Sequence, residues 1–198
     1  MENNSVPVGV AFFVTPNIAI TCGHNLRNKN IRDVVYLQDG KGLILQLQVD
    51  YIDIDLDFSL LKFNGVRAKH FTMIDSTPTL GTQFIVAGYN LGISEELVVD
   101  AFTLDVGIMQ GTVVKVSRNH FLYQSMTFGG DSGSALTLVG GNVIGIHLAG
   151  INEARERIDR LSTIKERLNE VEHSVDSLIK GTAQGCLGLL AGVIMKVI

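Results

Sequence analysis

The stretch MTFGGDSGSALTLVGGNVIGIHLAG, residues 126–150, decides the fold of this chain. Its apolar run NVIGIHL is typical of a buried strand that ends at glycine. Ahead of that run, Ser132 stands in a glycine-rich loop, between Asp131 and Gly133. Such a serine is either part of a plain tight turn or a nucleophile on a sharply bent loop. His147, inside the apolar run, raises a second question, because histidine is unusual in a buried strand.

The chain upstream of this stretch has the same β character. Short runs rich in Val, Ile, Leu and Phe alternate with Gly, Asn, Asp and Pro turn signals over residues 6–150. The runs are VGVAFFV, DVVYLQ, LILQLQVDYI, FSLLKF, TQFIVAGY, GTVVKV, FLYQS and NVIGIHL. Strands of this length and spacing predict an all-β barrel or sandwich.

Composition narrows the class of protein. Hydrophobic residues make up 46% of the 198 residues and charged residues 18%, which is enough apolar material for a sizeable core. The formal charge of −4 disfavours nucleic acid as a partner, because phosphate binding needs a basic face. The two cysteines, Cys22 and Cys186, are expected as free thiols, with one long-range disulfide as the alternative. No signal peptide is visible, so a cytoplasmic location is expected.

The pattern changes after Gly150, which predicts a domain boundary between residues 1–150 and 151–198. Residues 152–180 contain neither Gly nor Pro, and apolar residues recur at heptad spacing over 161–178. This predicts a C-terminal helix, which either packs on the β domain or forms a coiled coil with a second copy or a partner. The apolar tail 181–198 is too short to span a bilayer reliably, and its contact with a membrane stays open.

Three residues could together carry acyl-transfer chemistry. Ser132 is the candidate nucleophile, and the backbone N–H groups of Gly130 and Ser132 are candidate donors to an oxyanion. His24, which follows an apolar strand, a TPN turn and a second short strand, is the candidate base. Asp57 precedes the apolar run FSLLKF, where it would be sheltered enough to orient an imidazole. Asp55 is the runner-up for that role.

In this order, the motifs TCGHN, DFSLLK and GGDSGSA resemble those of the chymotrypsin-like serine endopeptidases. The resemblance covers roughly residues 6–150 and extends to compact bacterial-type trypsin-like domains, including the Deg/Htr proteases. It implies two packed antiparallel β-barrels of six strands each, with His24, Asp57 and Ser132 in the cleft between them. The fold class is therefore all-β, chymotrypsin-like, with a C-terminal α-helical extension.

The chain departs from the family pattern at three places. Asn25 replaces the cysteine that usually follows the catalytic histidine, so the disulfide of secreted relatives is absent. The N-terminal motif released by zymogen cleavage is also absent, so Asp131 needs another partner or is solvated. Finally, few residues precede GVAFFV, so the first barrel is either one strand short or completed by an upstream segment.

The residues that would line the specificity pocket differ from those of trypsin. Met126 stands where a trypsin-type pocket carries aspartate, which disfavours cleavage after Arg or Lys. Thr127, His147 and Gly150 instead resemble the pockets of glutamyl endopeptidases and picornaviral processing proteases. Hydroxyl and imidazole donors suit a side-chain carbonyl, so cleavage after Glu or Gln is expected. The alternative is that His147 is a core histidine bonded to nearby backbone.

The sequence thus predicts a serine endopeptidase that needs no cofactor and no metal. The alternative is a protease-fold binding or signalling module, assembled through the helix 152–180. Expected partners are a protein or peptide substrate and, through this helix, a second copy or another protein.

Overall fold

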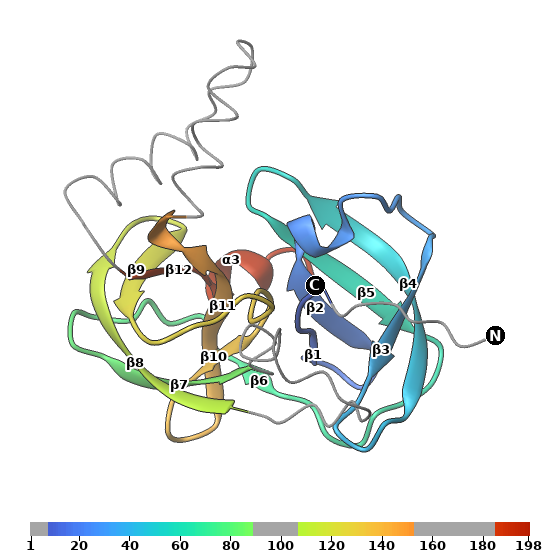
Figure 1. Ribbon diagram of the computed structural model, residues 1–198, viewed down its shortest axis with the longest axis horizontal. Coiled ribbons are helices and arrows are strands. Elements are labelled where there is room, and N and C mark those ends of the chain that lie inside the picture. The colour runs from blue at the N-terminus through green and yellow to red at the C-terminus, as the bar shows by residue number, and fades with distance from the viewer. Residues whose placement is uncertain (1–7, 89–106, 153–184) are drawn as a thin grey trace, which may run out of the picture.

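A computed structural model describes residues 8–88, 107–152 and 185–198. Two β-sheets curve into barrel-like bodies that lie side by side (Figure 1). Apart from strands, the described residues form a 3₁₀ turn at Gly23–Leu26 and a four-residue helix, α3, at Ala191–Ile194. The all-β prediction is confirmed. The predicted heptad seam over 161–178 lies outside the described residues.

The first sheet contains five strands in the order β1-β2-β5-β4-β3. Their bounds are Phe12–Phe13, Ile18–Cys22, Phe58–Phe63, Ile44–Asp53 and Val34–Gln38, in that order. In β4, Leu45, Leu47 and Val49 are buried while the residues between them are exposed, as expected for a sheet with one face inward.

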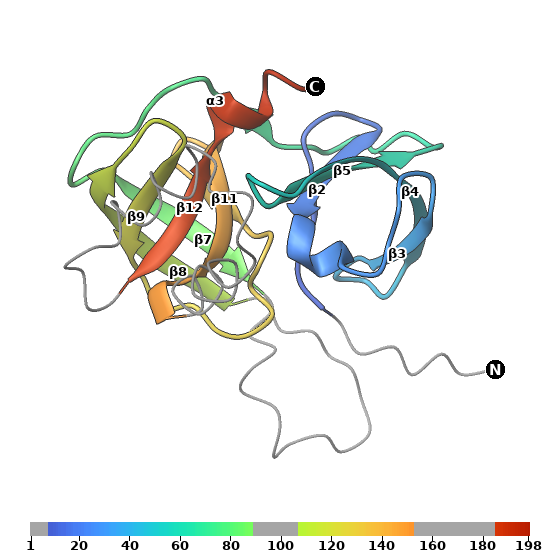
Figure 2. The same cartoon turned by 90° about the horizontal axis from the view of Figure 1, so that it is seen from above.

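One strand of the expected six is absent from the described part of this sheet. A groove of about 400 Å³ lies between the two edge strands, with Phe12 and Phe13 of β1 on one side and Leu37 and Gln38 of β3 on the other. In Figure 2 the strands β2, β5, β4 and β3 of this sheet form the ring on the right.

The second sheet closes into a six-stranded barrel. Its order is β10-β7-β8-β9-β12-β11, and β10 pairs again with β11 to complete the ring. The bounds are Ala135–Thr137, Gln83–Gly88, Gly107–Val116, His120–Gln124, Cys186–Leu190 and Asn142–Gly150, in that order. The short strand β6, Thr72–Met73, adds to β11 in parallel.

The last residues of the chain belong to the β domain, because residues 186–190 form its strand β12. The predicted domain boundary after Gly150 is corrected for these residues. Residues 186–190, which the sequence analysis placed in a separate tail, pair with β11 on one side and β9 on the other. All five are buried, and α3 follows them directly, with Ile194 in the main core. The apolar, glycine-rich composition of this segment therefore reflects a central strand rather than an appendage.

The largest buried cluster joins the two sheets. Ile20 and Phe58 from the first sheet pack in one cluster with Leu122 and Ile146 from the second. Each sheet also encloses a smaller cluster of its own. Because apolar burial holds the sheets together, the loops at their junction are positioned by both.

Candidate active site

The carboxylate of Asp57 binds His24 at two points. Its Oδ2 lies 2.8 Å from His24 Nδ1, and its Oδ1 accepts the backbone N–H of His24 at 2.8 Å. The backbone N–H of Gly23 adds a bond of 3.0 Å to the carbonyl oxygen of Asp57. With Nδ1 donating its proton to the carboxylate, Nε2 is left as the nitrogen with an acceptor lone pair.

The chain places this pair where two neighbouring strands meet. His24 lies in the 3₁₀ turn that follows β2, and Asp57 immediately precedes β5, which pairs with β2 along its whole length. Asp57 has a φ of +59°, a left-handed conformation that costs a non-glycine residue roughly 1–2 kcal/mol. The three bonds to residues 23 and 24 hold it there. Asp55 is exposed.

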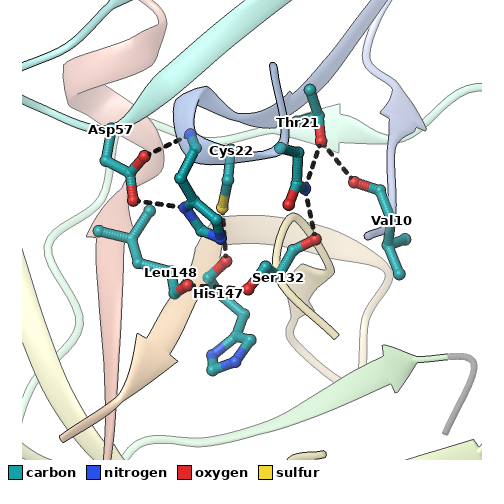
Figure 3. A network of polar contacts seen from close by, with 9 residues as sticks. Val10, Thr21, Cys22, Asp57, Ser132, His147 and Leu148 are labelled. Carbon is teal, nitrogen blue, oxygen red and sulfur yellow. Dashed lines mark hydrogen bonds and ion pairs between the residues drawn. The ribbon is translucent and has the colours of Figure 1, made fainter. Parts of the chain in front are cut away.

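The loop of Ser132 connects β9 to β10 of the second sheet. The carbonyl oxygen of Ser132 accepts the backbone N–H of Val10 at 2.8 Å and the side-chain amide of Asn25 at 3.0 Å. Its hydroxyl donates to the carbonyl of Leu148 in β11 at 3.1 Å (Figure 3). The structure therefore brings Ser132 to the same junction as the residue that follows His24.

Two backbone donors in this loop fit the predicted oxyanion site. Gly130 and Gly133 have φ values of +95° and +96°, which glycine adopts without strain. The N–H groups of Asp131 and Gly133 donate to the carbonyls of Phe128 and His147. By contrast, the N–H groups of Gly130 and Ser132 donate to no acceptor within the described stretches. These are the two donors that the sequence singled out.

The buried side chain of Asp131 has a hydrogen-bond partner within the protein. It is fully buried, and Oδ2 accepts the backbone N–H of Phe128 at 2.8 Å. A side chain at Gly88, at the end of β7, would collide with this carboxylate. Of the two alternatives left by the sequence, a partner within the protein is therefore correct, and the aspartate stabilises the loop that contains Ser132.

His147 is buried in β11 and bonded to a residue that sequence reasoning missed. Its Nδ1 lies 2.6 Å from the hydroxyl of Tyr123 in β9. Burial raises the pKa of Tyr123 well above its usual range, so this hydroxyl keeps its proton. A fully buried tyrosine needs a polar partner for its hydroxyl, which is the signal that could have pointed to this pair.

The other predicted pocket residues meet at the start of β12. Thr127 Oγ1 lies 3.1 Å from Cys186 Sγ, and Cys186 is opposite Gly150 on one side and Tyr123 on the other. Thr127, His147 and Gly150 therefore belong to one continuous set of contacts. Cys186 completes it, and was missed because it lay in the presumed tail. Neither Cys22 nor Cys186 forms a disulfide, as predicted.

A family model of the trypsin-like peptidase domain matches residues 9–146, which is most of the chain. The chain belongs to the trypsin-like peptidase family. The resemblance indicated by the three motifs is therefore confirmed at this level, and with it a protease of the hydrolase class.

Solved structures with this fold include several proteases. The MamO protease domain from Magnetospirillum magneticum superimposes with a TM-score of 0.65 at 17% identity, over 100% of this chain and 92% of that one. The active form of the Rv3671c protease from M. tuberculosis gives 0.62 at 14% identity, over 95% and 70%. The HtrA-type protease AlgW gives 0.64 at 16% identity, over 96% and 50%.

Because the sequence identities to these structures are low, the structural similarity establishes only the fold of this trypsin-like peptidase domain. No curated protein matches the sequence. Within residues 8–88, 107–152 and 185–198, no helix has the length and apolarity to cross a membrane.

Proposed function

We propose that this trypsin-like peptidase domain is a serine endopeptidase with the triad His24, Asp57 and Ser132. The observation that carries the proposal is the pair of hydrogen bonds from His24 to Asp57, through the ring Nδ1 and the backbone N–H, which holds one imidazole tautomer.

The proposed reaction begins when the Ser132 hydroxyl turns from the Leu148 carbonyl towards Nε2 of His24. Such hydrogen bonds are often formed only in the substrate complex. His24 takes the hydroxyl proton as Ser132 Oγ attacks the scissile carbonyl carbon, and Asp57 stabilises the imidazolium. The protonated imidazole then gives its proton to the leaving amine, and water hydrolyses the acyl-enzyme by the same steps.

The developing oxyanion would be bound by the N–H groups of Gly130 and Ser132. These donors are held before the reaction by bonds of the neighbouring residues: Gly133 and Ser134 bond to His147 of β11, and Asp131 bonds to Phe128 within the loop. Loss of one oxyanion donor typically costs on the order of 10² to 10³ in turnover.

We also propose that Thr127, His147 and Gly150 direct cleavage after Glu or Gln. His147 Nδ1 bonds to the Tyr123 hydroxyl, so we assign the contact with the substrate side chain to Nε2. Either neutral tautomer can bond to a glutamine amide, which both donates and accepts. A glutamate carboxylate requires a proton on Nε2. The Thr127 hydroxyl is the second group that we assign to contact with the substrate side chain.

Profiling a peptide library with the full chain tests both parts of the proposal, with Ser132→Ala as the control. Cuts are expected after Glu or Gln in the presence of Ser132 and at no position in its absence. Cutting after Arg or Lys would refute the pocket assignment. A folded chain that cuts nothing in the library would refute the endopeptidase.

A second candidate function, assembly through residues 152–180, is favoured by where this segment joins the fold. Its heptad pattern lies between β11 and β12, and the N–H of Ile151 bonds to the carbonyl of Gly185 at 2.9 Å. Ile151 and Gly185, which lie on either side of this segment in the sequence, are therefore adjacent, next to the paired residues Gly150 and Cys186.

Replacement of residues 153–184 by a short Gly/Ser turn separates the two functions without removing β12. Fewer chains per particle in solution with retained cleavage would assign assembly to the segment and catalysis to the barrels. An unchanged number of chains per particle would exclude assembly through this segment.

A further inference from the structure

Cys22 lies beside the candidate triad, although the proposed reaction gives its thiol no task. It is the last residue of β2, two positions before His24, and it is fully buried. Its Sγ donates to the carbonyl of His147 at 3.2 Å. One ligand atom each from Cys22, His24 and Asp57 lie within 4.8 Å of one another (Figure 3).

From this arrangement we infer that Cys22, His24 and Asp57 form an inhibitory binding site for a zinc-class divalent cation. In the part of the chain that the structure covers, it is the one such cluster of thiol, imidazole and carboxylate ligands. Sulfur and nitrogen donors select Zn²⁺ and similar transition metals, whereas Mg²⁺ and Ca²⁺ prefer oxygen donors alone. We assign the ion a regulatory role and no part in catalysis. The site is therefore compatible with a reaction that needs no metal.

The distances are compatible with a tetrahedral site after a small contraction. Zinc binds sulfur at about 2.3 Å and nitrogen or oxygen at about 2.0–2.2 Å, so neighbouring donors stand roughly 3.3–3.8 Å apart. Donors that now lie within 4.8 Å of one another would move by about one ångström at most. The wider separations close around the ion, while the Nδ1–Oδ2 contact of 2.8 Å opens to admit it.

The carboxylate is already anchored for such a role. Oδ1 of Asp57 remains bonded to the backbone N–H of His24, while Oδ2 exchanges the Nδ1 proton for the cation. A second bond of this kind orients metal ligands in proteins. Binding releases two protons to solvent, one from Nδ1 and one from the Cys22 thiol, and forms bonds from the ion to nitrogen, sulfur and oxygen. Water completes the fourth position.

Two of the three ligands are accessible to an ion from solvent. The side chains of His24 and Asp57 are 16% and 18% exposed, whereas Cys22 lies behind them. An ion would therefore bind the two exposed donors first and the thiol last.

Occupancy would inactivate the triad, a consequence that rests on the proposed function. A cation on the imidazole lowers its basicity, and the carboxylate no longer orients the ring towards Ser132. The binding itself is independent of catalysis.

Binding is tested with Co²⁺ on the full chain carrying Ser132→Ala. One equivalent is expected to bind with the near-ultraviolet absorption of a cobalt–thiolate bond. Cys22→Ala and the more conservative Cys22→Ser should weaken binding by at least about tenfold and remove that absorption. Cys186→Ala, the matched change at the other buried free thiol, should retain both. A folded chain without thiolate absorption, or equal absorption after loss of Cys22, overturns the inference.

Inhibition is tested by labelling chains that retain Ser132 with a fluorophosphonate probe, with and without Zn²⁺. The ratio of the two labelling rates should fall at least tenfold for the unsubstituted chain, recover with a chelator, and stay near one for Cys22→Ala. An equal fall in both chains would overturn the site at Cys22. Absent labelling without Zn²⁺ would refute the proposed function instead, and the Co²⁺ result would still stand.

Discussion

The two sides of the candidate active site are built differently. On the His24 side, the three bonds that fix the His24–Asp57 pair all join Asp57 to residues 23–24, within the first sheet. On the Ser132 side, the loop depends on both sheets, through Val10 and Asn25 of the first and His147 of the second. The first side is therefore a local unit, whereas the second also joins the two barrels. Changes on the first side should affect chemistry alone, and changes on the second should also affect stability.

The largest effect is expected from Asp57→Asn. An amide in place of the carboxylate leaves His24 in the wrong tautomer, so hydrolysis of the best library peptide should fall on the order of 10⁴-fold. The free energy of unfolding should change little. The matched control is Asp55→Asn, at the exposed acidic residue two positions earlier, which should retain the rate. Equal losses in both variants would contradict the assignment of Asp57.

On the other side, Gly133→Ala should destabilise the protein by about 3 kcal/mol or more, measured by urea unfolding. The residue has a φ of +96°, and a Cβ would collide with the carbonyl of Val10 and crowd the Thr21 hydroxyl. Gly140→Ala is the control, because no atom lies within 4 Å of its Cβ position. The comparison fails if the two variants are equally stable.

Acid should weaken the second barrel through His120, which is buried in β9. Burial lowers its pKa to about 4, against an opposing effect from the charge of Asp57. Because the folded-state pKa is below the unfolded value of about 6.5, the stability contributed by the neutral ring is complete above pH 6.5. It is lost as the pH falls towards 4, by roughly 2–3 kcal/mol.

Urea unfolding at several pH values between 7.5 and 4 measures this effect. His120→Leu should remove that part of the pH dependence while the carboxylates still contribute theirs. A variant with the same pH dependence as the unsubstituted chain would show that His120 is not the group responsible.

The smallest effect is expected from Asn25→Ala. This side chain donates to the Thr21 hydroxyl and to the Ser132 carbonyl, both at 3.0 Å, and so ties the two sides together. Its loss should cost about 1–2 kcal/mol of unfolding free energy. Asn28→Ala, at an exposed position of the same loop, should stay within about 0.5 kcal/mol. Thermal unfolding of both variants provides the comparison.

The same difference explains what the sequence could predict. His24 and Asp57 were identifiable because each is set by its own strand and turn, and the two strands pair directly. Tyr123 and Cys186 were not, because their roles arise from neighbours brought together by strand pairing across the barrel. β12 was missed for a related reason: more than thirty residues separate it from its partner β11, and pairing between distant segments leaves no local pattern. The serine loop was recognisable, but its dependence on Val10 and Asn25 was not.

Mass spectrometry of the full chain after fluorophosphonate treatment tests the central claim most directly. The account predicts a single adduct on Ser132, formed at a rate that falls by several orders of magnitude in His24→Ala. A folded chain with no adduct, an adduct on another serine, or an equal rate without His24 would contradict it.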